Sequence, residues 1–441
     1  MRPDENLYQT LPDGTLKHVH PVSRTEVWTV PSRAHRPFHR PTPPVHDIVP
    51  QSPENYCDFC AGSYLRTPPE KSRLIRGRDG VQRLDQLGPD LYDQSQALFR
   101  RVANLFEIVT LDYWVKNHGF QPSAEQKRRR QAYWDNPKGR AHVIQMVETK
   151  LTFAGYSPDE LKGMSDAQKL GLGDAFFFGS HDLIIAGPHY VPGARKDNQY
   201  FSSGEMTPGD HREFFRFTLD ALRDLQDQNP GVRYVSVFQN WLQPAGASLN
   251  HLHKQLVGMD EWGVSIHQAV KAVQANPRLF NEQILGPARK RGLVLAENSQ
   301  AVALCEWGHR YPTLAIYSKS EKARPEDHSP DELGGLSDLV QACHAATGNQ
   351  IPCNEEWFFT PRDSKAPLPW HVLIKWRTLN QAGFEGGTKI YINPLSPQAL
   401  RDKLSPVLLD LREKGRIADM RIAEECGKDS SPLRYDQGGG A

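Results

Sequence analysis

The chain has 441 residues, enough for two or three domains with sizeable cores. Its 53 Lys and Arg residues nearly balance its 52 Asp and Glu residues, which argues against a general basic field for nucleic acid or an anionic membrane and favours small substrates. Six cysteines are too few for a disulfide scaffold in so long a chain, and no apolar leader or membrane-spanning stretch is present, so we expect a soluble, cytoplasmic protein.

The first sharp motif along the chain is the turn Cys57-Asp-Phe-Cys60. A C-x-x-C turn can place two thiolates on one tetrahedral metal ion, so it predicts half of a zinc site. The missing ligands must come from elsewhere, and His251, His189 and His181 are candidates at the ends of predicted strands. A redox-active pair is the competing interpretation, but such a pair normally opens a helix after a strand, and this segment is typical of a turn. We favour a metal, with a structural role if no coordination position is vacant.

A charged, helix-rich stretch lies between about residues 107 and 174 and does not fit the strand pattern around it. We interpret it as a helical insertion. Its run Lys127-Arg-Arg-Arg130 could serve as a docking surface. Such a run is more often a solvated face, so nucleic-acid binding is not favoured here.

The second half of the chain repeats an order of elements: apolar strand, amphipathic helix, apolar strand, and a strand that carries histidine. The first copy comprises residues 182–187, 210–228, 234–239 and 251–257, and the second comprises 313–318, 330–346, 355–360 and 371–376. We therefore predict a duplicated α+β unit. The first unit, with the insertion, is placed in residues 1–285 and the second in 286–427, followed by a disordered tail over 428–441.

The segment GASLNHLHKQ, residues 246–255, carries the strongest chemical signal. Alternate residues of a strand share a face, so His251, His253 and Gln255 form a row with about 6–7 Å between neighbours. A neutral imidazole can attack phosphorus, bind a metal or donate a hydrogen bond, and an amide can hold a phosphoryl oxygen without titrating. The row predicts phosphoryl or nucleotidyl transfer, although one of the histidines could instead be a structural group.

The second copy lacks most of this row. Aligning the copies places His371 at the position of His251, Leu373 at that of His253, and Lys375 at that of Gln255. Only the first copy is therefore predicted to be catalytic.

Several further segments complete a pattern in chain order: HPVSRTEVWTVPSRAHRPF (20–38), CDFCAG (57–62), RRVANLFEIV (100–109), SHDLIIAGPH (180–189), FQN (238–240), GASLNHLHKQ (246–255) and AGFEGGTKIYINPLSP (382–397). In this order and spacing they resemble the galactose-1-phosphate uridylyltransferase-like family, the transferase branch of the histidine-triad superfamily. The resemblance covers most of the chain except the insertion. It implies an α+β fold of two tandem histidine-triad-like units, antiparallel sheets with packed helices in one pseudo-duplicated body, and a possible homodimer.

The resemblance also implies a ping-pong reaction. His253 would attack the α-phosphorus of a nucleotide sugar, release a sugar 1-phosphate, and pass the nucleotidyl group to a second sugar 1-phosphate, while Gln255 holds the phosphoryl oxygens. The implied substrate contacts are Arg33, Arg36, Asn104, Phe106, Asn240, Ser248, Phe384 and Glu385, the last two on a sugar-contact strand. One structural zinc ion per chain would be held by Cys57, Cys60, His189 and His251.

Three points bear on the choice among related activities. Histidine-triad hydrolases carry a histidine where this chain has Gln255, so transfer between phosphorylated sugars fits better than hydrolysis. Some family members bind iron in the second half, but Phe358 and Leu373 stand at two such positions, and we expect no iron site. The insertion and the loop 190–206 are atypical and leave the sugar and the base open.

The first hypothesis is therefore a UDP-hexose:hexose-1-phosphate uridylyltransferase-like enzyme of galactose and carbohydrate metabolism. The alternative enzyme is a phosphorylase or adenylyltransferase of the same superfamily, acting on a dinucleoside polyphosphate or an ADP-sugar. A zinc-stabilised interaction protein is the non-enzymatic alternative. Binding that does not depend on His253 would distinguish it from the enzymes.

Overall fold

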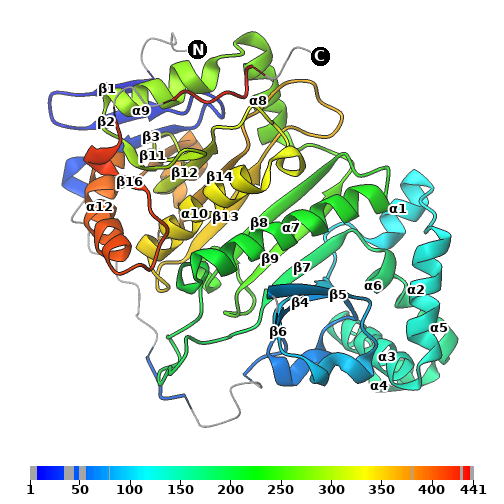
Figure 1. The fold of residues 1–441 in the computed structure, drawn as a ribbon. Helices are drawn as coiled ribbons and strands as arrows, with labels where there is room; N and C mark the ends of the chain where they lie inside the picture. Colours follow the sequence, from blue (N-terminus) through cyan, green and yellow to red (C-terminus); the bar gives the residue numbers. More distant parts are fainter. Residues whose placement is uncertain are drawn as a thin grey trace.

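The computed structural model describes residues 7–33, 44–48, 56–78, 80–378, 381–427 and 431–437. Over these residues one antiparallel sheet of twelve strands runs through both halves of the chain (Figure 1). In spatial order its strands are β16 (Arg421–Ile422), β10 (Val294–Glu297), β11 (Ala301–Glu306), β12 (Thr313–Ser318), β14 (His371–Trp376), β13 (Cys353–Phe358), β8 (Tyr234–Trp241), β9 (His253–Met259), β7 (His181–Ala186), β6 (Ala97–Ala103), β4 (Glu70–Gly77) and β5 (Gly80–Asp85). A smaller sheet contains β1 (Tyr8–Thr10), β2 (Leu16–Val19), β3 (Glu26–Thr29) and β15 (Ile390–Ile392).

The helices fall into three groups along the chain. The insertion contains α1 (Leu111–His118), α2 (Ala124–Asp135), α3 (Pro137–Phe153), α4 (Pro158–Gly163), α5 (Asp166–Leu172) and α6 (Ala175–Phe178). Two long helices follow the central strands: α7 (Pro208–Gln228) and α10 (Pro330–Thr347). The remaining helices are α8 (Val264–Ala275), α9 (Gly286–Lys290), α11 (Gly383–Thr388) and α12 (Pro397–Glu413). None of these helices of the described residues is long and apolar enough to span a membrane.

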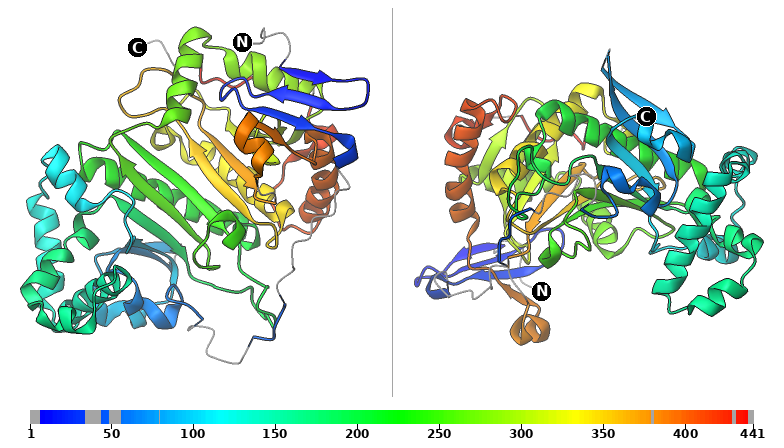
Figure 2. Two further views of the ribbon diagram at one scale, coloured as in Figure 1. Left: turned by 180° about the vertical axis from the view of Figure 1, so that it is seen from behind. Right: turned by 90° about the horizontal axis from the view of Figure 1, so that it is seen from below.

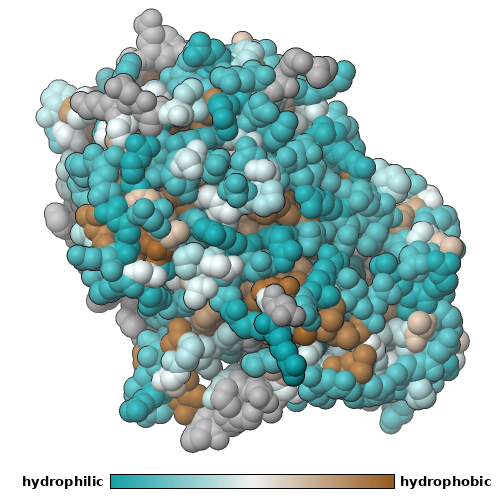
Figure 3. Space-filling view, viewed as in Figure 1, coloured by the Kyte–Doolittle hydropathy of each residue, from teal (hydrophilic) through white to brown (hydrophobic). Residues whose placement is uncertain are grey.

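Helices α7 and α10 cover one face of the large sheet (Figure 1). Helix α10 begins at the predicted residue 330, and α7 begins two residues before the predicted residue 210. Thr207 and Ser329 cap the first turns with their hydroxyl groups, and proline follows at the first helical position. Their buried residues recur at helical spacing, and Phe214, Phe217 and Leu222 of α7 are each at most 1% exposed. The outward side of this face is largely hydrophilic (Figure 3). Seen from behind, strands β8, β9, β13 and β14 carry no long helix of the described residues (Figure 2, left).

The strand pairing confirms the duplicated fold. Strands β8 and β13 pair antiparallel at the centre of the sheet, with Gln239 opposite Glu355. Gln255 lies opposite Phe238 on the first side, and Lys375 lies opposite Asn354 on the second. A two-fold relation through the β8–β13 pair therefore carries Gln255 onto Lys375 and, two residues earlier, His253 onto Leu373. The boundaries assigned to the two units stay predictions.

The insertion is helical, and it packs at the end of the sheet formed by β4, β5 and β6 (Figure 1). Its basic run is engaged in ion pairs within the insertion. Arg128 and Arg129 contact Glu125 one turn away, and Arg130 lies 2.9 Å from Asp174. These pairs favour a solvated face over a docking surface for this run.

The segment 431–437 differs from the disordered tail that we expected. Leu433 and Tyr435 are at most 1% exposed, and the Tyr435 hydroxyl accepts a hydrogen bond from the Phe280 backbone N–H at 3.1 Å. The physical reason is that two large side chains of a polar segment pack into the core, Tyr435 against Phe280, which sequence composition does not reveal. Residues 428–430 and 438–441 lie outside the described residues.

Candidate active site and metal centre

Four metal-ligating side chains meet where the C-terminal end of β7 lies beside the N-terminal end of β9. They are Cys57 and Cys60 of the turn, His189 after β7 and His251 before β9. The two sulfur atoms lie 3.7 Å apart, and each lies 3.3 to 3.8 Å from the Nδ1 atoms of the two histidines. Zinc with bonds of about 2.3 Å to sulfur and about 2.0 Å to nitrogen requires separations of about 3.8 Å between sulfurs and about 3.5 Å from sulfur to nitrogen. The donor set therefore fits a tetrahedral zinc ion.

The surroundings of the four donors favour the metal-binding form. His251 donates its Nε2–H to the Ala186 carbonyl at 2.7 Å, which leaves the Nδ1 lone pair facing the sulfur atoms. Hydrogen bonding from Cys57, together with both histidines, lowers the pKa of the Cys60 thiol and favours its thiolate. Sequence reasoning left open whether His181 or His189 completes the group, and the structure places His189 there.

His253 begins β9 and points to the face of the sheet that α7 and α10 leave open. Its Nδ1–H donates to the His251 carbonyl at 2.8 Å, so the lone pair of the neutral ring is on Nε2. Burial lowers the pKa of His253 to about 4, which keeps the imidazole neutral near pH 7. The ring is 6% exposed and packs against the edge of Phe59. The adjacent Lys254 points the other way, where its Nζ lies 2.5 Å from a carboxylate oxygen of Glu355 on β13.

Gln255 is held by two side chains that sequence reasoning had not assigned together. Its Oε1 faces His181 Nε2 at 3.1 Å and Asn104 Nδ2 at 3.4 Å. His181 Nδ1 accepts the Ile108 backbone N–H at 3.1 Å, so the proton of the neutral ring is on Nε2 and is donated to Gln255; Asn104 Nδ2, 3.0 Å from the same nitrogen, is then not a donor to it. Because the amide oxygen is engaged in this way, the amide NH₂ group remains to face a phosphoryl oxygen. The role of His181 could not be found from sequence, since it depends on the register of β7 against β9.

Three other predicted contacts lie around this face. Asn240 of β8 precedes the loop to β9, and its Oδ1 accepts a hydrogen bond from Asn354 Nδ2 at 2.7 Å. Ser248 is exposed in that loop. Phe106 is 51% exposed and packs edge-on against Phe153 of α3, with ring centroids 5.5 Å apart. The insertion therefore borders the open face near the predicted nucleoside contacts.

The structure does not bring two of the remaining predicted contacts, Phe384 and Glu385, to His253. Phe384 and Glu385 lie on helix α11 beside the smaller sheet, where we expected a strand, and the strand β15 begins only at Ile390. The reason is local, because Glu385 caps the helix by accepting the Ala382 N–H at 3.0 Å, and the β-branched residues come later. Arg33 is exposed after β3. Arg36 lies outside the described residues.

A second group of potential metal ligands lies in the other half of the sheet. It consists of His20, Glu306 and His309. Phe358 and Leu373, which replace expected iron ligands, line the same region. The expectation that no iron is bound stays a prediction.

Comparisons with known proteins agree with this architecture. ADP-glucose phosphorylase of Arabidopsis thaliana is 24% identical over 241 residues, which are 53% of this chain and 66% of that protein, slightly less than two thirds of its length. The crystal structure of an ADP-glucose phosphorylase from Arabidopsis thaliana with bound ADP-glucose superimposes with a TM-score of 0.57 at 17% identity, over 88% of this chain and 97% of that one. A galactose-1-phosphate uridylyltransferase-like protein from Arabidopsis thaliana gives a TM-score of 0.53 at 16% identity, over 80% and 92% of the two chains.

These likenesses confirm the fold and the resemblance to the galactose-1-phosphate uridylyltransferase-like branch. A family described as a domain of unknown function, DUF4921, matches residues 11–435, which is nearly the whole length. The chain therefore belongs to the DUF4921 family, and its fold is that of the galactose-1-phosphate uridylyltransferase-like proteins.

Proposed function

We propose that this protein transfers a nucleoside monophosphate group from a nucleotide sugar to an anionic acceptor through a covalent bond to His253. The observation that carries the proposal is the availability of His253 Nε2. Its ring is neutral, its other nitrogen is engaged by a backbone carbonyl, and the amide of Gln255 lies two residues along the same face. A histidine in this state is a nucleophile that needs no separate base to activate it.

In the first step, the lone pair of His253 Nε2 attacks the α-phosphorus of the nucleotide sugar. A nitrogen–phosphorus bond forms, and the bond from that phosphorus to the bridging oxygen breaks, so that the sugar 1-phosphate leaves with the electron pair. The proton on Nδ1 stays hydrogen-bonded to the His251 carbonyl and stabilises the positive charge that develops on the ring. Gln255 would donate from its amide to a non-bridging oxygen of the phosphoryl group.

In the second step, an acceptor oxygen attacks the same phosphorus and the nitrogen–phosphorus bond breaks. If the acceptor is inorganic phosphate, the product is a nucleoside diphosphate. If it is a sugar 1-phosphate, the product is a new nucleotide sugar. Gln255 is an amide and cannot supply or regain a proton, which favours anionic acceptors over water.

We infer that the four-ligand group holds one structural zinc ion through Cys57, Cys60, His189 and His251. The fit of the donor separations to a tetrahedral ion supports this inference. When bound, such an ion fixes the start of β9 against the end of β7. His251 then positions the carbonyl oxygen that accepts the proton of His253.

Adenine is the first base to test. The similar protein of Arabidopsis thaliana is named ADP-glucose phosphorylase, and a solved structure with this fold contains ADP-glucose. This likeness supports the phosphorylase alternative over the uridylyltransferase that the motifs first suggested. Uridine stays the second candidate, because the motif GASLNHLHKQ does not itself determine which base is bound.

The decisive experiment is intact-mass spectrometry of the protein after incubation with ADP-glucose, UDP-glucose and GDP-mannose in separate samples. We expect a mass increase of one nucleotidyl group, largest with ADP-glucose, that disappears when inorganic phosphate is added. The variant His253→Ala should form no adduct. The matched control is His267→Ala, which removes an exposed histidine of α8 and should leave adduct formation unchanged.

An adduct formed with UDP-glucose alone would support the covalent mechanism through His253 and contradict the choice of adenine as the base. Absence of any adduct, combined with unaltered binding of nucleotide sugars by His253→Ala, would reject the covalent mechanism and favour a binding protein.

A further inference from the structure

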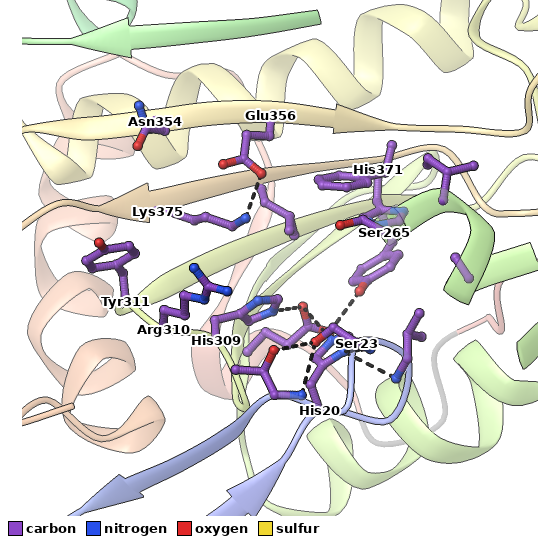
Figure 4. Close-up of a pocket in the computed structure, with 18 of the residues that line it drawn as sticks. His20, Ser23, Ser265, His309, Arg310, Tyr311, Asn354, Glu356, His371 and Lys375 are labelled. Carbon is purple, nitrogen blue, oxygen red and sulfur yellow. Dashed lines mark hydrogen bonds and ion pairs between the residues drawn. The ribbon is translucent and has the colours of Figure 1, made fainter. Parts of the chain in front are cut away.

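The second half of the sheet bears a cavity of about 700 Å³ (Figure 4). It opens on the same face of the sheet as His253, because Asn354 and Lys375 share that face through the pairing of β8, β13 and β14. Its volume lies within the range of pockets that bind small molecules. Part of its lining is apolar: Phe280, Tyr317, Phe358, Leu368 and Leu373.

The position of the cavity follows from the duplication. Lys375 stands where the first unit has Gln255, and Tyr311 stands where it has His181. Leu373 replaces His253, so the second unit keeps the place of a ligand pocket but has no nucleophile. The strands that line the cavity, β13 to β11, lie two to five strand spacings from β9, or about 10 to 24 Å, and most of the strand residues in the lining are on the farther strands. A small ligand bound at His253 therefore does not fill this cavity.

The charged lining has an excess of cations. Arg310, Lys375 and Arg377 face two carboxylates, Glu306 and Glu356. Lys375 Nζ lies 2.6 Å from Glu356. Arg310 is exposed at the mouth over the ring of a tyrosine and has no carboxylate partner among the residues that the structure describes.

Glu306 is already satisfied by its neighbours. One oxygen accepts the Tyr317 hydroxyl at 2.8 Å, and the other lies 2.7 Å from His309 Nε2. Burial opposes its charge, but the neighbouring imidazoles of His20 and His309 hold the pKa of this carboxyl well below its usual range. These neutral donors do not cancel its negative charge, but the three cations of the lining outnumber the two carboxylates.

His20 supplies a buried donor without an acceptor. Its Nδ1 accepts the backbone N–H groups of Val22 and Ser23 at 3.2 and 3.1 Å, so the neutral ring carries its proton on Nε2. That Nε2 is buried without a hydrogen-bond partner, 3.8 Å from Glu306. A metal would need a lone pair at this nitrogen, so the His20–Glu306–His309 group is not a suitable metal site. A buried donor of this kind instead favours an incoming anionic oxygen.

We propose that this cavity is a second, non-catalytic binding site for a small phosphate ester with a ring. The phosphate oxygens accept from His20 and lie against the cations Arg310 and Lys375, and the ring packs on the apolar wall that includes Phe358. Nucleotides and sugar phosphates share this chemistry. The site does not depend on His253, so it is independent of the proposed transfer reaction.

The test counts bound ligands on the full-length protein by equilibrium dialysis with labelled ADP and, separately, labelled glucose 1-phosphate. Two variants address the cavity: Arg310→Glu reverses the charge at its mouth, and Ser265→Trp places a large side chain from the exposed start of α8 into its entrance. We expect each variant to lose one bound ligand per chain, or to weaken that site at least about 10-fold. Adduct formation at His253 should remain. The control Lys162→Glu reverses a charge on the insertion, 79% exposed at its side chain, and should bind as the unaltered protein does.

Loss of ADP binding in the cavity variants would identify the ligand as a nucleotide. Loss of glucose 1-phosphate binding would identify it as a sugar phosphate. Equal numbers of bound ligands in the unaltered protein and both cavity variants, for both ligands, would overturn the proposal. A failure of the proposed transfer reaction would show as absence of the His253 adduct, which is a separate measurement.

Discussion

Backbone contacts decide which nitrogen atom of each histidine is available at the candidate site. The Ala186 carbonyl accepts a hydrogen bond from His251 Nε2–H, which leaves the Nδ1 lone pair facing the cysteines. The His251 carbonyl accepts a hydrogen bond from His253 Nδ1–H, which leaves the lone pair on Nε2. The Ile108 N–H occupies His181 Nδ1 and directs the other N–H toward Gln255. Three histidines of ordinary chemistry thereby obtain three different roles.

Replacing His181 tests its role as a positioning residue. We expect His181→Ala to lower kcat on the order of 10- to 100-fold with a smaller change in KM, because the amide of Gln255 loses the donor that orients it. Steady-state kinetics with the best nucleotide sugar measure the split between kcat and KM.

A conservative variant separates orientation from general damage. His181→Gln keeps an N–H donor and should recover part of the lost kcat. The double variant His181→Ala with Gln255→Ala should be no slower than Gln255→Ala alone, since both changes remove the same interaction. Fully additive losses would show that His181 acts independently of Gln255.

Removal of one thiolate tests the metal centre. We expect about one zinc per chain in the purified protein, and less than half of that in Cys57→Ser, because the hydroxyl is a far weaker ligand than the thiolate it replaces. Metal analysis by inductively coupled plasma mass spectrometry gives the ratio. Cys426→Ser alters a cysteine outside the group and should keep the full zinc content. Full zinc content in Cys57→Ser would remove the proposed site.

Local spacing made part of this site predictable. The C-x-x-C turn and the alternation of His251, His253 and Gln255 follow from adjacent residues, and the resemblance supplied His189. The place of His181 beside Gln255 could not be predicted, because it requires knowing that His181 lies opposite Val257 across β7 and β9. Strand register is a long-range property that neither spacing nor composition determines.

At the scale of elements, the insertion packs against the first unit through a buried histidine. His142 of α3 is 2% exposed, and its Nε2 donates to the Thr67 carbonyl at 2.9 Å while its Nδ1 accepts the Tyr133 hydroxyl at 2.7 Å. Burial is the main cause that lowers the pKa of His142 to about 4. The neutral ring is therefore part of the contact between α3 and the segment that leads into β4.

Acidification should weaken this contact. The unfolded state binds a proton at its usual pKa of about 6.5, and the folded state resists it until about pH 4, so stability is complete above pH 6.5 and is lost as the pH falls toward 4. We expect a loss of about 2 kcal/mol between pH 7 and pH 5 in the opening free energy of α3, measured by hydrogen exchange of its amides. His142→Gln keeps a donor and an acceptor but does not titrate. The loss in the opening free energy of α3 between pH 7 and pH 5 should therefore be about 2 kcal/mol smaller in this variant. Equal losses in both proteins would contradict the assignment.

Elements with a strong period were predicted more accurately than those fixed by distant packing. Strands β12 and β14 match the predicted residues 313–318 and 371–376, and the helices α7 and α10 differ by a few residues at their ends. Helix α11 was expected as a strand, because the resemblance placed a strand there and three glycines gave no helical period. Residues 431–437 were expected to be disordered, but Tyr435 is fully buried. The cap by Glu385 decided the first outcome, and the contact of Tyr435 with Phe280 decided the second.

At the scale of the molecule, one sheet carries two units that have diverged. The first keeps the nucleophile, and the second keeps only a cavity. The predicted sugar contacts Phe384 and Glu385 lie beside the smaller sheet, which packs near the end of β11. Five strand spacings, or about 24 Å, separate β11 from β9. We predict that these two residues contact the sugar from a second copy of the chain, in a homodimer with shared sites.

Mixing two inactive variants tests this arrangement. His253→Ala and Glu385→Ala should each lose most activity alone, since one removes the nucleophile and the other a hydrogen-bond acceptor for the sugar. In a shared-site dimer, co-expression in equal amounts should restore about a quarter of the normal sites, because half of the dimers are mixed and each mixed dimer has one intact site of two. Activity of the purified mixture and its mass by light scattering give the two readouts.

The matched control co-expresses His253→Ala with Gln255→Ala. These two residues lie on the same strand and serve the same site, so each site of a mixed dimer is still missing one of them and no activity should return. Full activity of Glu385→Ala alone, or equal recovery in both mixtures, would contradict sugar binding across two copies. Recovery in the first mixture alone would place α11 of one chain at the nucleophile of the other.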